Sequence, residues 1–343
     1  MATFAAADPL ARVRSLAADA RWLDALDALE ALGAAAAADP ALRDDVTAHG
    51  ERFRKARALC GDDSDAAAEA EPWQGNFEAF GVKTSFRYDD DGLLWLRTAG
   101  AMDDVDLFYT VGVLREIQLF GEWIPFLRQS RVVHARDFAR LLTHFTIGLR
   151  GVLSRDCVLR VAACNAALNG DALYFEGASL PPDATDWHGA SVPPRETGWG
   201  LDRMHVHALL AKVSFTAKHS QYARVVVCVD LRTRLPRAIL DFFMKRLVGL
   251  FLWLWRRQSR YVSAHERCPH RAAIDADPAF YRDWLRPKYE EYCASMGWDD
   301  SALVVDPDDV GEALPPDDGT PATAPSLASP GLMARFNPFG GGS

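Results

Sequence analysis

The chain has 343 residues, of which 49% are hydrophobic and 10% aromatic, which is enough to bury one large core or two ordinary ones. The formal net charge of −9 argues against nucleic-acid binding, because nucleic-acid-binding domains usually carry a basic patch or stripe. The six cysteines lack paired spacing and the N-terminus lacks a secretory pattern, so we expect reduced thiols and a cytoplasmic protein.

Residues 1–60 are predicted to form an N-terminal helical extension. Asp8-Pro9 and Asp39-Pro40 each join a capping residue to a first-turn proline. Between them, apolar residues recur at helical spacing, at Trp22, Leu23, Leu26, Leu29 and Leu32. Residues 61–71 contain five acidic residues and no large apolar one, and are therefore predicted to be an acidic linker.

A β-rich pattern dominates residues 72–296. Val82–Tyr88 and Leu93–Met102 are predicted strands joined by an Asp-Gly turn, and Val105–Phe120 has a helical pattern. Further strands are predicted at Ser130–Arg136, Phe138–Ile147, Asp156–Ala163, Ala172–Ala178, Met204–Phe215 and Ala223–Leu231. Because consecutive strands without intervening helices usually pair antiparallel, we expect an α+β fold with one curved antiparallel meander.

One of these strands is apolar on both faces, because Val225 to Val229 form an unbroken apolar run. Such a strand is either covered on both sides or meets something apolar on its second side. The segment that follows, Leu235–Val262, is predicted to be a long amphipathic helix. Its apolar stripe runs through Ile239, Leu240, Phe243, Leu247, Leu250, Leu254 and Tyr261.

This predicted helix is too interrupted to span a bilayer, because its longest apolar run is bounded by Arg246 and Arg256. Two interpretations of the stripe stay open. It packs against a sheet in the ordinary way, or it closes a cavity that holds an apolar ligand.

Three segments of residues 72–296 together share a pattern with a known family. They are LREIQLFGEWIPFL at 114–127, SRDCVLRV at 154–161 and YARVVVCVDLRTRLPRAILDFFMKRLVGLFLWLWRRQ at 222–258. These segments resemble the START family, the StAR-related lipid-transfer domains. The resemblance implies a helix-grip fold, in which a curved antiparallel sheet wraps around a long C-terminal helix. It also implies an internal hydrophobic cavity that holds one lipid, such as a sterol, a phospholipid or a sphingolipid.

Candidate ligand-binding residues follow from the helical stripe and from one choice of strand phase. They are Phe243, Leu247, Leu250, Phe251 and Leu254 on the helix, and Met204, Val206, Ala208, Val225 and Val227 on the strands. A slip of one residue would exchange the strand residues for neighbours such as Val226 and Cys228. Arg160 is set among apolar residues and is a candidate inward cation for a headgroup or hydroxyl, although such an arginine more often faces solvent.

The predicted long helix carries a local charge of +5, because six cations face only Asp241. Cations near the C-terminal end of a helix complement its dipole. They also suit anionic lipid headgroups. We therefore expect transient contact of a peripheral kind with a membrane surface, through Trp253, Trp255, Arg256 and Arg257.

The sequence contains no recognised catalytic or phosphate-binding motif, and no cofactor is expected. His205 and His207 would share one face of a strand, and Cys268 lies between His265 and His270, but no further ligand is identifiable, so no metal site is predicted. The alternatives to lipid binding are a helix-grip enzyme or cyclase acting on an apolar substrate, and a scaffold with a vestigial cavity. An enzyme would need two or more titratable residues converging inside the cavity.

Three remaining segments are predicted from composition. Residues 181–202 are rich in turn residues and form either a loop at the cavity mouth or a surface insertion. Ala279–Met296 is expected to pack on the outside of the domain. Residues 297–343 are predicted to be a mostly disordered tail, and this tail or the N-terminal helices are candidates for contact with a protein partner.

Overall fold

The computed structural model describes residues 8–61, 73–79, 81–149, 153–195, 201–230 and 248–298, together with 303 and 305. Within these residues, the helical elements are α1 (Ala11–Ala18), α2 (Trp22–Leu32), η1 (Gly33–Ala38), α3 (Pro40–Leu59), α4 (Leu107–Arg115), η3 (Ile117–Leu119), α5 (Phe120–Trp123), η4 (Ala167–Asn169), α7 (Val248–Ala264), α8 (Pro269–Ala276), α9 (Pro278–Phe280), η6 (Tyr281–Leu285) and α10 (Arg286–Ser295).

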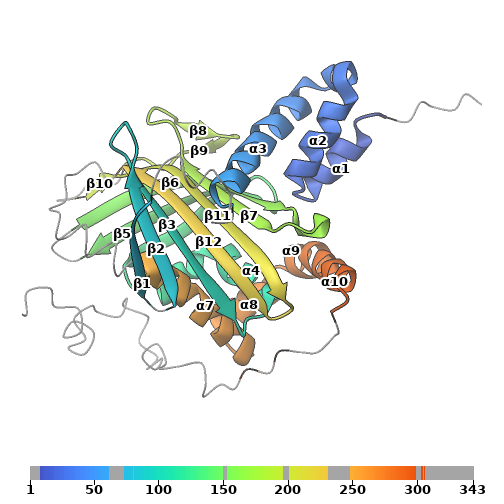
Figure 1. Cartoon of the computed structure of the whole chain (residues 1–343). Coiled ribbons are helices and arrows are strands. Elements are labelled where there is room, and N and C mark those ends of the chain that lie inside the picture. Colours follow the sequence, from blue (N-terminus) through green and yellow to red (C-terminus); the bar gives the residue numbers. More distant parts are fainter. Residues whose placement is uncertain are drawn as a thin grey trace, which may run out of the picture.

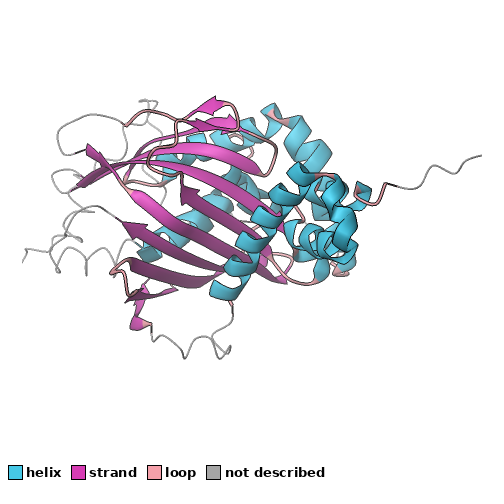
Figure 2. Ribbon diagram, turned by 90° about the horizontal axis from the view of Figure 1, so that it is seen from above, coloured by secondary structure: helices cyan, strands magenta, loops and turns pink. Residues whose placement is uncertain are grey.

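The strands form one large sheet and a separate small hairpin (Figure 1). They are β1 (Gln74–Ala79), β2 (Val82–Tyr88), β3 (Leu94–Asp103), β4 (Leu127–Ala135), β5 (Arg140–Leu149), β6 (Leu153–Asn165), β7 (Leu173–Ser179), β8 (Asp186–Trp187), β9 (Ala190–Ser191), β10 (Leu201–Arg203), β11 (His205–Ala217) and β12 (Ser220–Asp230). The large sheet has the order β1-β2-β3-β12-β11-β7-β6-β5-β4, with β10 added beside β6. Figure 2 shows its strands as one twisted layer with helices packed against it.

Each strand predicted from the sequence is present, but the sheet is not a simple meander. All neighbouring strands pair antiparallel except β10, which pairs parallel with β6. The second and the last strands of the predicted series meet in the middle, because β3 pairs with β12. The chain reaches the far edge at β4 through α4, η3 and α5, which explains why consecutive strands do not remain neighbours there.

Helix α3 begins where the pattern Asp39-Pro40 predicted, whereas α1 begins at Ala11 after Leu10 and has no side-chain cap from Asp8. The Asp39 carboxylate accepts a hydrogen bond from the Leu42 backbone nitrogen at 3.1 Å, and Pro40 occupies the first turn of α3. This arrangement satisfies a backbone donor that a helix start otherwise leaves unpaired. The apolar stripe predicted around Trp22 faces the protein interior, because Trp22, Leu26 and the other buried residues of α2 pack in one core cluster.

One predicted helix ends earlier than expected, and another lies only partly within the described residues. The helical pattern of Val105–Phe120 ends earlier than predicted, because α4 stops at Arg115 and continues as the tighter turn η3. Of the predicted helix Leu235–Val262, the described part is α7, from Val248 onward. Residues 231–247 lie outside the described residues.

The large sheet is covered on both faces. We call the face that packs against α4, α7, α8 and α9 the inner face, where side chains from β12 meet Leu254 and Trp255 in one core cluster. We call the other the outer face, where α2 and α3 pack against β6, β7 and β11 around Trp22 and Phe53. The molecule therefore has two separate cores on opposite sides of one sheet.

Candidate functional site

Successive residues of a strand point to opposite faces of the sheet, so each face has its own set of side chains. The set on the inner face is apolar. On β12, Val225 and Val227 pack in the cluster with α7, whereas Val226 packs with the N-terminal helices. β11 repeats the pattern, with Val213 on the inner face and Leu210 on the outer one. The unbroken valine run of β12 is thus explained by cover on both faces.

Helix α7 lies on the inner face and contacts β2, β3 and α4 (Figure 1). Leu254 and Trp255 are buried, and the Trp255 Nε1 donates a hydrogen bond to the Thr110 carbonyl oxygen at 3.3 Å. Leu250 and Phe251 pack against the same cluster but remain half-buried. The C-terminal part of α7 is therefore fixed, while its first turns leave apolar surface only partly covered.

A cavity of about 130 Å³ lies between the inner face, α4 and the C-terminal helices. Helix α4 contributes Val111 and Leu114, and the sheet contributes Val161, Leu173 and Phe175. The C-terminal helices complete the wall with Phe280, Trp284, Leu285 and Lys288. The lining is therefore mainly aliphatic and aromatic.

Two cations are the charged residues of this lining. The Arg115 guanidinium carbon lies 4.9 Å from the Phe280 ring centroid. The Lys288 Nζ lies 4.6 Å from the Trp284 ring centroid and 2.8 Å from the Asp19 carboxylate. The described residues that line the cavity include no carboxylate and no histidine. The site therefore offers positive charge beside apolar surface, without an acid–base pair.

The remaining titratable groups of the lining stay neutral. Burial raises the pKa of the Cys164 thiol to about 12, so the thiol is protonated at neutral pH. Burial and a hydrogen bond to the Asp171 carboxylate raise the pKa of Tyr174. Neither group is poised as a nucleophile or base near pH 7.

A buried polar pair holds the cavity wall in position. Glu116 follows α4, is only 6% exposed, and accepts a hydrogen bond from the Tyr281 hydroxyl at 2.5 Å. Burial and the Glu116 carboxylate raise the pKa of Tyr281, so the hydroxyl remains a donor. The pair ties the end of α4 to η6, on either side of the cavity.

Some of the ligand-binding residues predicted on the long helix Leu235–Val262 lie outside the described residues. Phe243 and Leu247 lie outside the described residues. Leu250, Phe251 and Leu254 belong to the inner-face cluster. None of these three lines the 130 Å³ cavity, which α4 and the C-terminal helices bound instead.

The residues predicted on β11 are not all on the same face. Met204 and Val206 join a separate apolar cluster with Cys157 and Leu159. Ala208 packs against the outer-face core instead, which corrects its predicted inward position. The reason is a β-bulge between Val206 and Ala208, which shifts the alternation by one residue.

Arg160 does not point toward the inner cavity, contrary to its predicted role. Its Nη1 donates a hydrogen bond to the Glu176 carboxylate at 2.8 Å on the outer face. Arg160 lies opposite Ala178 in the β6–β7 ladder, and the next residue, Val161, lines the inner cavity. Strand alternation therefore places the Arg160 guanidinium beneath α3.

The predicted membrane-contact residues differ in exposure. Trp255 is only 1% exposed, so it is a core residue and not a surface residue, which corrects its predicted role. Trp253 and Arg257 are half-buried, and the guanidinium carbon lies 5.3 Å from the indole centroid. The Arg256 Nε donates to the Asp103 carbonyl oxygen at 3.1 Å.

The C-terminal segment was placed correctly only in part by the sequence reasoning. Phe280 and Tyr281 are 3% and 2% exposed and pack in the inner-face core, so the first part of Ala279–Met296 is a cavity wall, while much of α10 is exposed on the outside. The cavity residues of α4 were also not identified. The aromatic pair Phe280 and Trp284, at helical spacing, was the available signal.

The histidines considered for metal binding do not form a metal site. The rings of His205 and His207 lie 4.5 Å apart, as strand spacing predicts. Across the described ranges, no three histidine, cysteine, aspartate or glutamate residues are grouped so that they could hold a metal ion. In the same part of the chain, no helix combines the length and the apolarity needed to cross a membrane.

Comparisons with known proteins found similar folds among solved structures. No family model and no curated protein matches the chain. The structure of human STARD10 is similar with a TM-score of 0.52 at 14% identity, over 70% of this chain and 87% of that one. Human StAR-related lipid transfer protein 5 gives 0.49 at 15% identity, over 63% and 95%. The human StarD13 lipid transfer and protein localization domain gives 0.40 at 14% identity, over 62% and 94%.

The likeness to STARD10 and the packing of α7 on the inner face identify the architecture independently of the sequence segments quoted above. The chain therefore has the α+β helix-grip fold of the START domains.

Proposed function

We propose that the chain binds one lipid or other apolar small molecule on the inner face of its sheet and transfers it between membranes. The observation that carries this proposal is the apolar cavity between the inner face, α4 and the C-terminal helices. Its walls continue into half-buried side chains of the same core, including Phe145, Ile147 and Phe251.

The energy available from such a site is sufficient for binding. Removal of apolar surface from water contributes about 25 cal/mol per Å², so several hundred Å² of ligand surface contribute roughly 10 kcal/mol. Part of this is offset by the lost freedom of the ligand and of the side chains that close over it. Hydrophobic burial alone can therefore hold a lipid without any catalytic group.

The cavity volume indicates that binding requires opening. An apolar cavity of about 150 Å³ accommodates a benzene molecule, whereas drug-sized ligands occupy pockets of about 300 to 1,000 Å³. The 130 Å³ cavity would thus hold one ring or a short part of a chain. A whole lipid enters only when half-buried inner-face side chains such as Leu173 and Phe175 move aside.

The two lining cations favour a lipid with an anionic group. Arg115 and Lys288 stand at a cavity that is otherwise apolar. A phosphate-bearing phospholipid or sphingolipid would satisfy them better than the single hydroxyl of a sterol would. The absence of a carboxylate and a histidine from the described lining also favours binding over catalysis, because acid–base chemistry requires a donor and an acceptor.

Transfer would require a membrane contact, for which α7 is the candidate. Trp253 and Arg257 are half-buried on this helix, and tryptophan and arginine together suit the boundary between headgroups and acyl chains. A protein partner is not needed to cover the apolar stripe of α2, because the outer face of the sheet already does so.

Native mass spectrometry of the protein purified from cells tests the proposal. Val161→Trp fills the cavity with an indole, whereas Val161→Ala enlarges it at the same position. We expect a co-purifying lipid with the wild type and Val161→Ala, and at least a tenfold loss with Val161→Trp. Thermal melting checks that both variants fold. Equal lipid loading in all three proteins, or none in the wild type, would contradict the site.

A further inference from the structure

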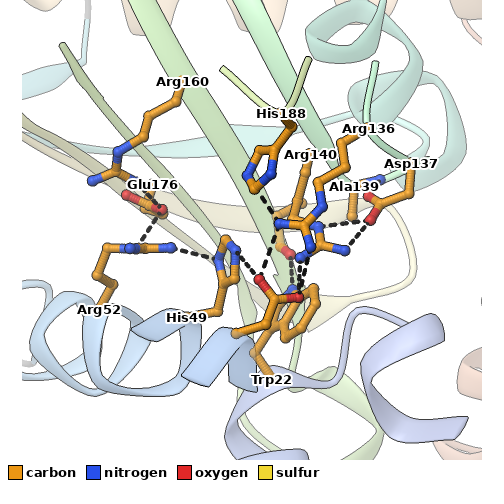
Figure 3. A network of polar contacts seen from close by, with 12 residues as sticks. Trp22, His49, Arg52, Arg136, Asp137, Ala139, Arg140, Arg160, Glu176 and His188 are labelled. Atoms are coloured by element: carbon orange, nitrogen blue, oxygen red, sulfur yellow. Dashed lines mark hydrogen bonds and ion pairs between the residues drawn. The ribbon is translucent and has the colours of Figure 1, made fainter. Parts of the chain in front are cut away.

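A second pocket lies on the outer face of the sheet, away from the apolar cavity. Its volume is about 370 Å³, and it lies between α3, the strands β5 to β7 and the β8–β9 hairpin. Four arginines line it, two of which flank the β4–β5 turn: Arg52, Arg136, Arg140 and Arg160 (Figure 3). The apolar cavity, by comparison, has only two cations in its described lining.

The four arginines share two carboxylates. Glu176 is 3% exposed and lies 2.9 Å from the Arg52 Nε and 2.8 Å from the Arg160 Nη1. Asp45 accepts from the Arg136 Nη1 at 3.0 Å and from the Arg140 Nη1 at 2.6 Å. Each carboxylate therefore neutralises only one of the two guanidinium groups that it contacts.

The remaining acidic residues do not remove this excess. Asp44 lines the pocket but is held by Arg43, whose Nη2 lies 2.8 Å from its carboxylate. Asp137 lies outside the lining and accepts from the Arg140 Nε at 2.6 Å. With histidines neutral, four arginines against three carboxylates leave the lining with one positive charge.

The two histidines of the pocket are consistent with a positive local field. Burial, followed by the charges of Arg52 and Arg140, lowers the pKa of His49 to about 3. Burial, followed by the charge of Arg136, lowers the pKa of His188. Both rings are therefore neutral at pH 7 and serve as hydrogen-bonding groups, as His49 does when it contacts the Arg52 Nη2 at 2.8 Å.

We propose that this pocket binds a phosphate monoester, with its phosphate held by Arg52, Arg136 and Arg160. Guanidinium groups match phosphate oxygens in a two-pronged geometry, and arginine clusters are the usual protein partners of phosphate. The volume of 370 Å³ lies within the range of small-molecule sites and exceeds what inorganic phosphate alone would fill. The Trp187 indole on the β8–β9 hairpin supplies an apolar wall for the organic part of the ester.

The guanidinium groups differ in the capacity that they have left for a ligand. Both Nη atoms of Arg136 donate to Asp45, at 3.0 and 3.2 Å, so Arg136 contributes mainly its charge, whereas Arg160 has donors to spare. In the contacts among the described residues, Arg160 uses Nη1 for Glu176 and leaves Nε and Nη2 without a protein acceptor. The side chains of Arg52, Arg136 and Arg160 are 32%, 28% and 26% exposed, whereas that of Arg140 is 11% exposed. Arg140 instead lies over the Trp22 ring at 4.7 Å, which gives it a structural role.

A purely structural network is the competing explanation, because the same ion pairs dock α3 on the sheet. The two explanations predict different effects of added phosphate on the stability of the protein. A docking network gains nothing from added phosphate, whereas a binding site is stabilised by its ligand through mass action. The proposal does not depend on the proposed lipid function, because the arginine cluster lies on the outer face, although Val161 and Ala162 of β6 line both the pocket and the apolar cavity.

Isothermal titration and thermal melting of the full chain provide the test, with adenosine 5′-monophosphate as the probe and adenosine as its phosphate-free counterpart. The monophosphate should bind and raise Tm, and adenosine should do neither. Arg160→Gln should weaken binding by about tenfold to a hundredfold, because a charge-assisted bond to the phosphate is lost.

Arg54→Gln is the matched control, since it removes an arginine of the same helix and its bonds to Asp27 and Glu30 outside the pocket. It should leave binding unchanged. Vesicles of phosphatidylcholine with and without phosphatidic acid distinguish the source of the phosphate. Binding to phosphatidic acid that requires Arg160, without binding of the soluble ester, would assign the pocket to a lipid headgroup.

Three results would overturn the proposal. One is the absence of binding by wild-type protein to adenosine monophosphate, inorganic phosphate and phosphatidic acid alike. Another is an equal effect of Arg54→Gln and Arg160→Gln, which would indicate a general charge effect. The third is equal binding of adenosine, which would exclude recognition of the phosphate.

Discussion

The two faces of the sheet are covered by different physical means. The outer face is closed by α2 and α3 through tightly packed apolar contacts around Trp22 and through ion pairs at the rim, where the polar arginine-lined pocket lies. The inner face is closed by α4, α7 and the C-terminal helices through aromatic and aliphatic contacts that leave a cavity. The comparison teaches that one sheet can carry two cores of different character, one closed by apolar packing and ion pairs and one that encloses an apolar cavity.

The largest effect is expected from removal of the aromatic anchor of either face. Trp22 and Trp255 are both 1% exposed, and each indole nitrogen donates to a backbone carbonyl, of Ala163 at 3.0 Å and of Thr110 at 3.3 Å. Trp22→Ala and Trp255→Ala should each lower the free energy of unfolding by about 3–5 kcal/mol, as measured by urea denaturation. The corresponding Phe variants should cost less, because they lose mainly the hydrogen bond.

This pair also tests whether the two faces unfold together. If they do, both variants give a single transition with a shifted midpoint. A separate early transition for Trp22→Ala alone would show that α1 to α3 detach from the sheet while the inner core persists.

Packing tightness distinguishes the faces at two glycines. An added Cβ at Gly50 of α3 would lie 2.5 Å from the Leu26 Cδ2, whereas one at Gly177 of β7 would lie 3.2 Å from Leu209 and Val161. Gly50→Ala should therefore cost about 1–3 kcal/mol of unfolding free energy in spite of the better helix propensity of alanine. Gly177→Ala should cost less than 1 kcal/mol, since side chains beside a cavity can move.

Thermal or urea unfolding of both glycine variants measures this difference. A cost for Gly177→Ala that equals or exceeds that of Gly50→Ala would mean that the inner face is as rigid as the outer one. The idea that inner-face side chains move aside for a lipid would then lose its support.

The smallest effect is expected from the acid titration of His270, which lies in α8 on the inner side of the sheet. Burial lowers the pKa of His270 to about 4, and its Nε2 has no hydrogen-bond partner among the described residues. Because an unfolded histidine binds a proton below about pH 6.5, the unfolded state takes up the proton first, and stability falls as the pH falls from about 6.5 to 4. His270→Asn should remove about 1–2 kcal/mol of this loss.

The measurement is the free energy of unfolding at pH 7 and pH 4.5 for wild type and His270→Asn. The difference between the two pH values should be smaller in the variant. An identical difference would show that the buried imidazole does not contribute to acid sensitivity, and the test does not depend on how much the substitution costs at neutral pH.

Much of the fold followed from local pattern. The alternation of β2 and β3, the capping by Asp39 and the helical stripe around Trp22 depend on residues close together in the chain. Such short-range preferences are visible in a single sequence. The sequence segments resembling START domains pointed to the same architecture that the described strands and helices have.

The cavity residues were less accessible to this reasoning. Phe280 and Trp284 meet Leu114 and Phe175 across more than a hundred residues of chain, and no periodicity records which helix will cover which strand. The shift of Ala208 to the outer face came from a bulge, which one sequence does not reveal because only the partner strand defines it.

What the sequence by itself determined is the type and order of the elements, since these depend on the spacing of apolar residues and on capping and turn residues. Only the tertiary structure decided the environment of individual side chains. It placed Arg160 against Glu176 under α3 and buried Trp255 against Thr110. Both outcomes depend on partners distant in sequence, and the energy of burying a charge or a ring is set by those partners and not by the residue itself.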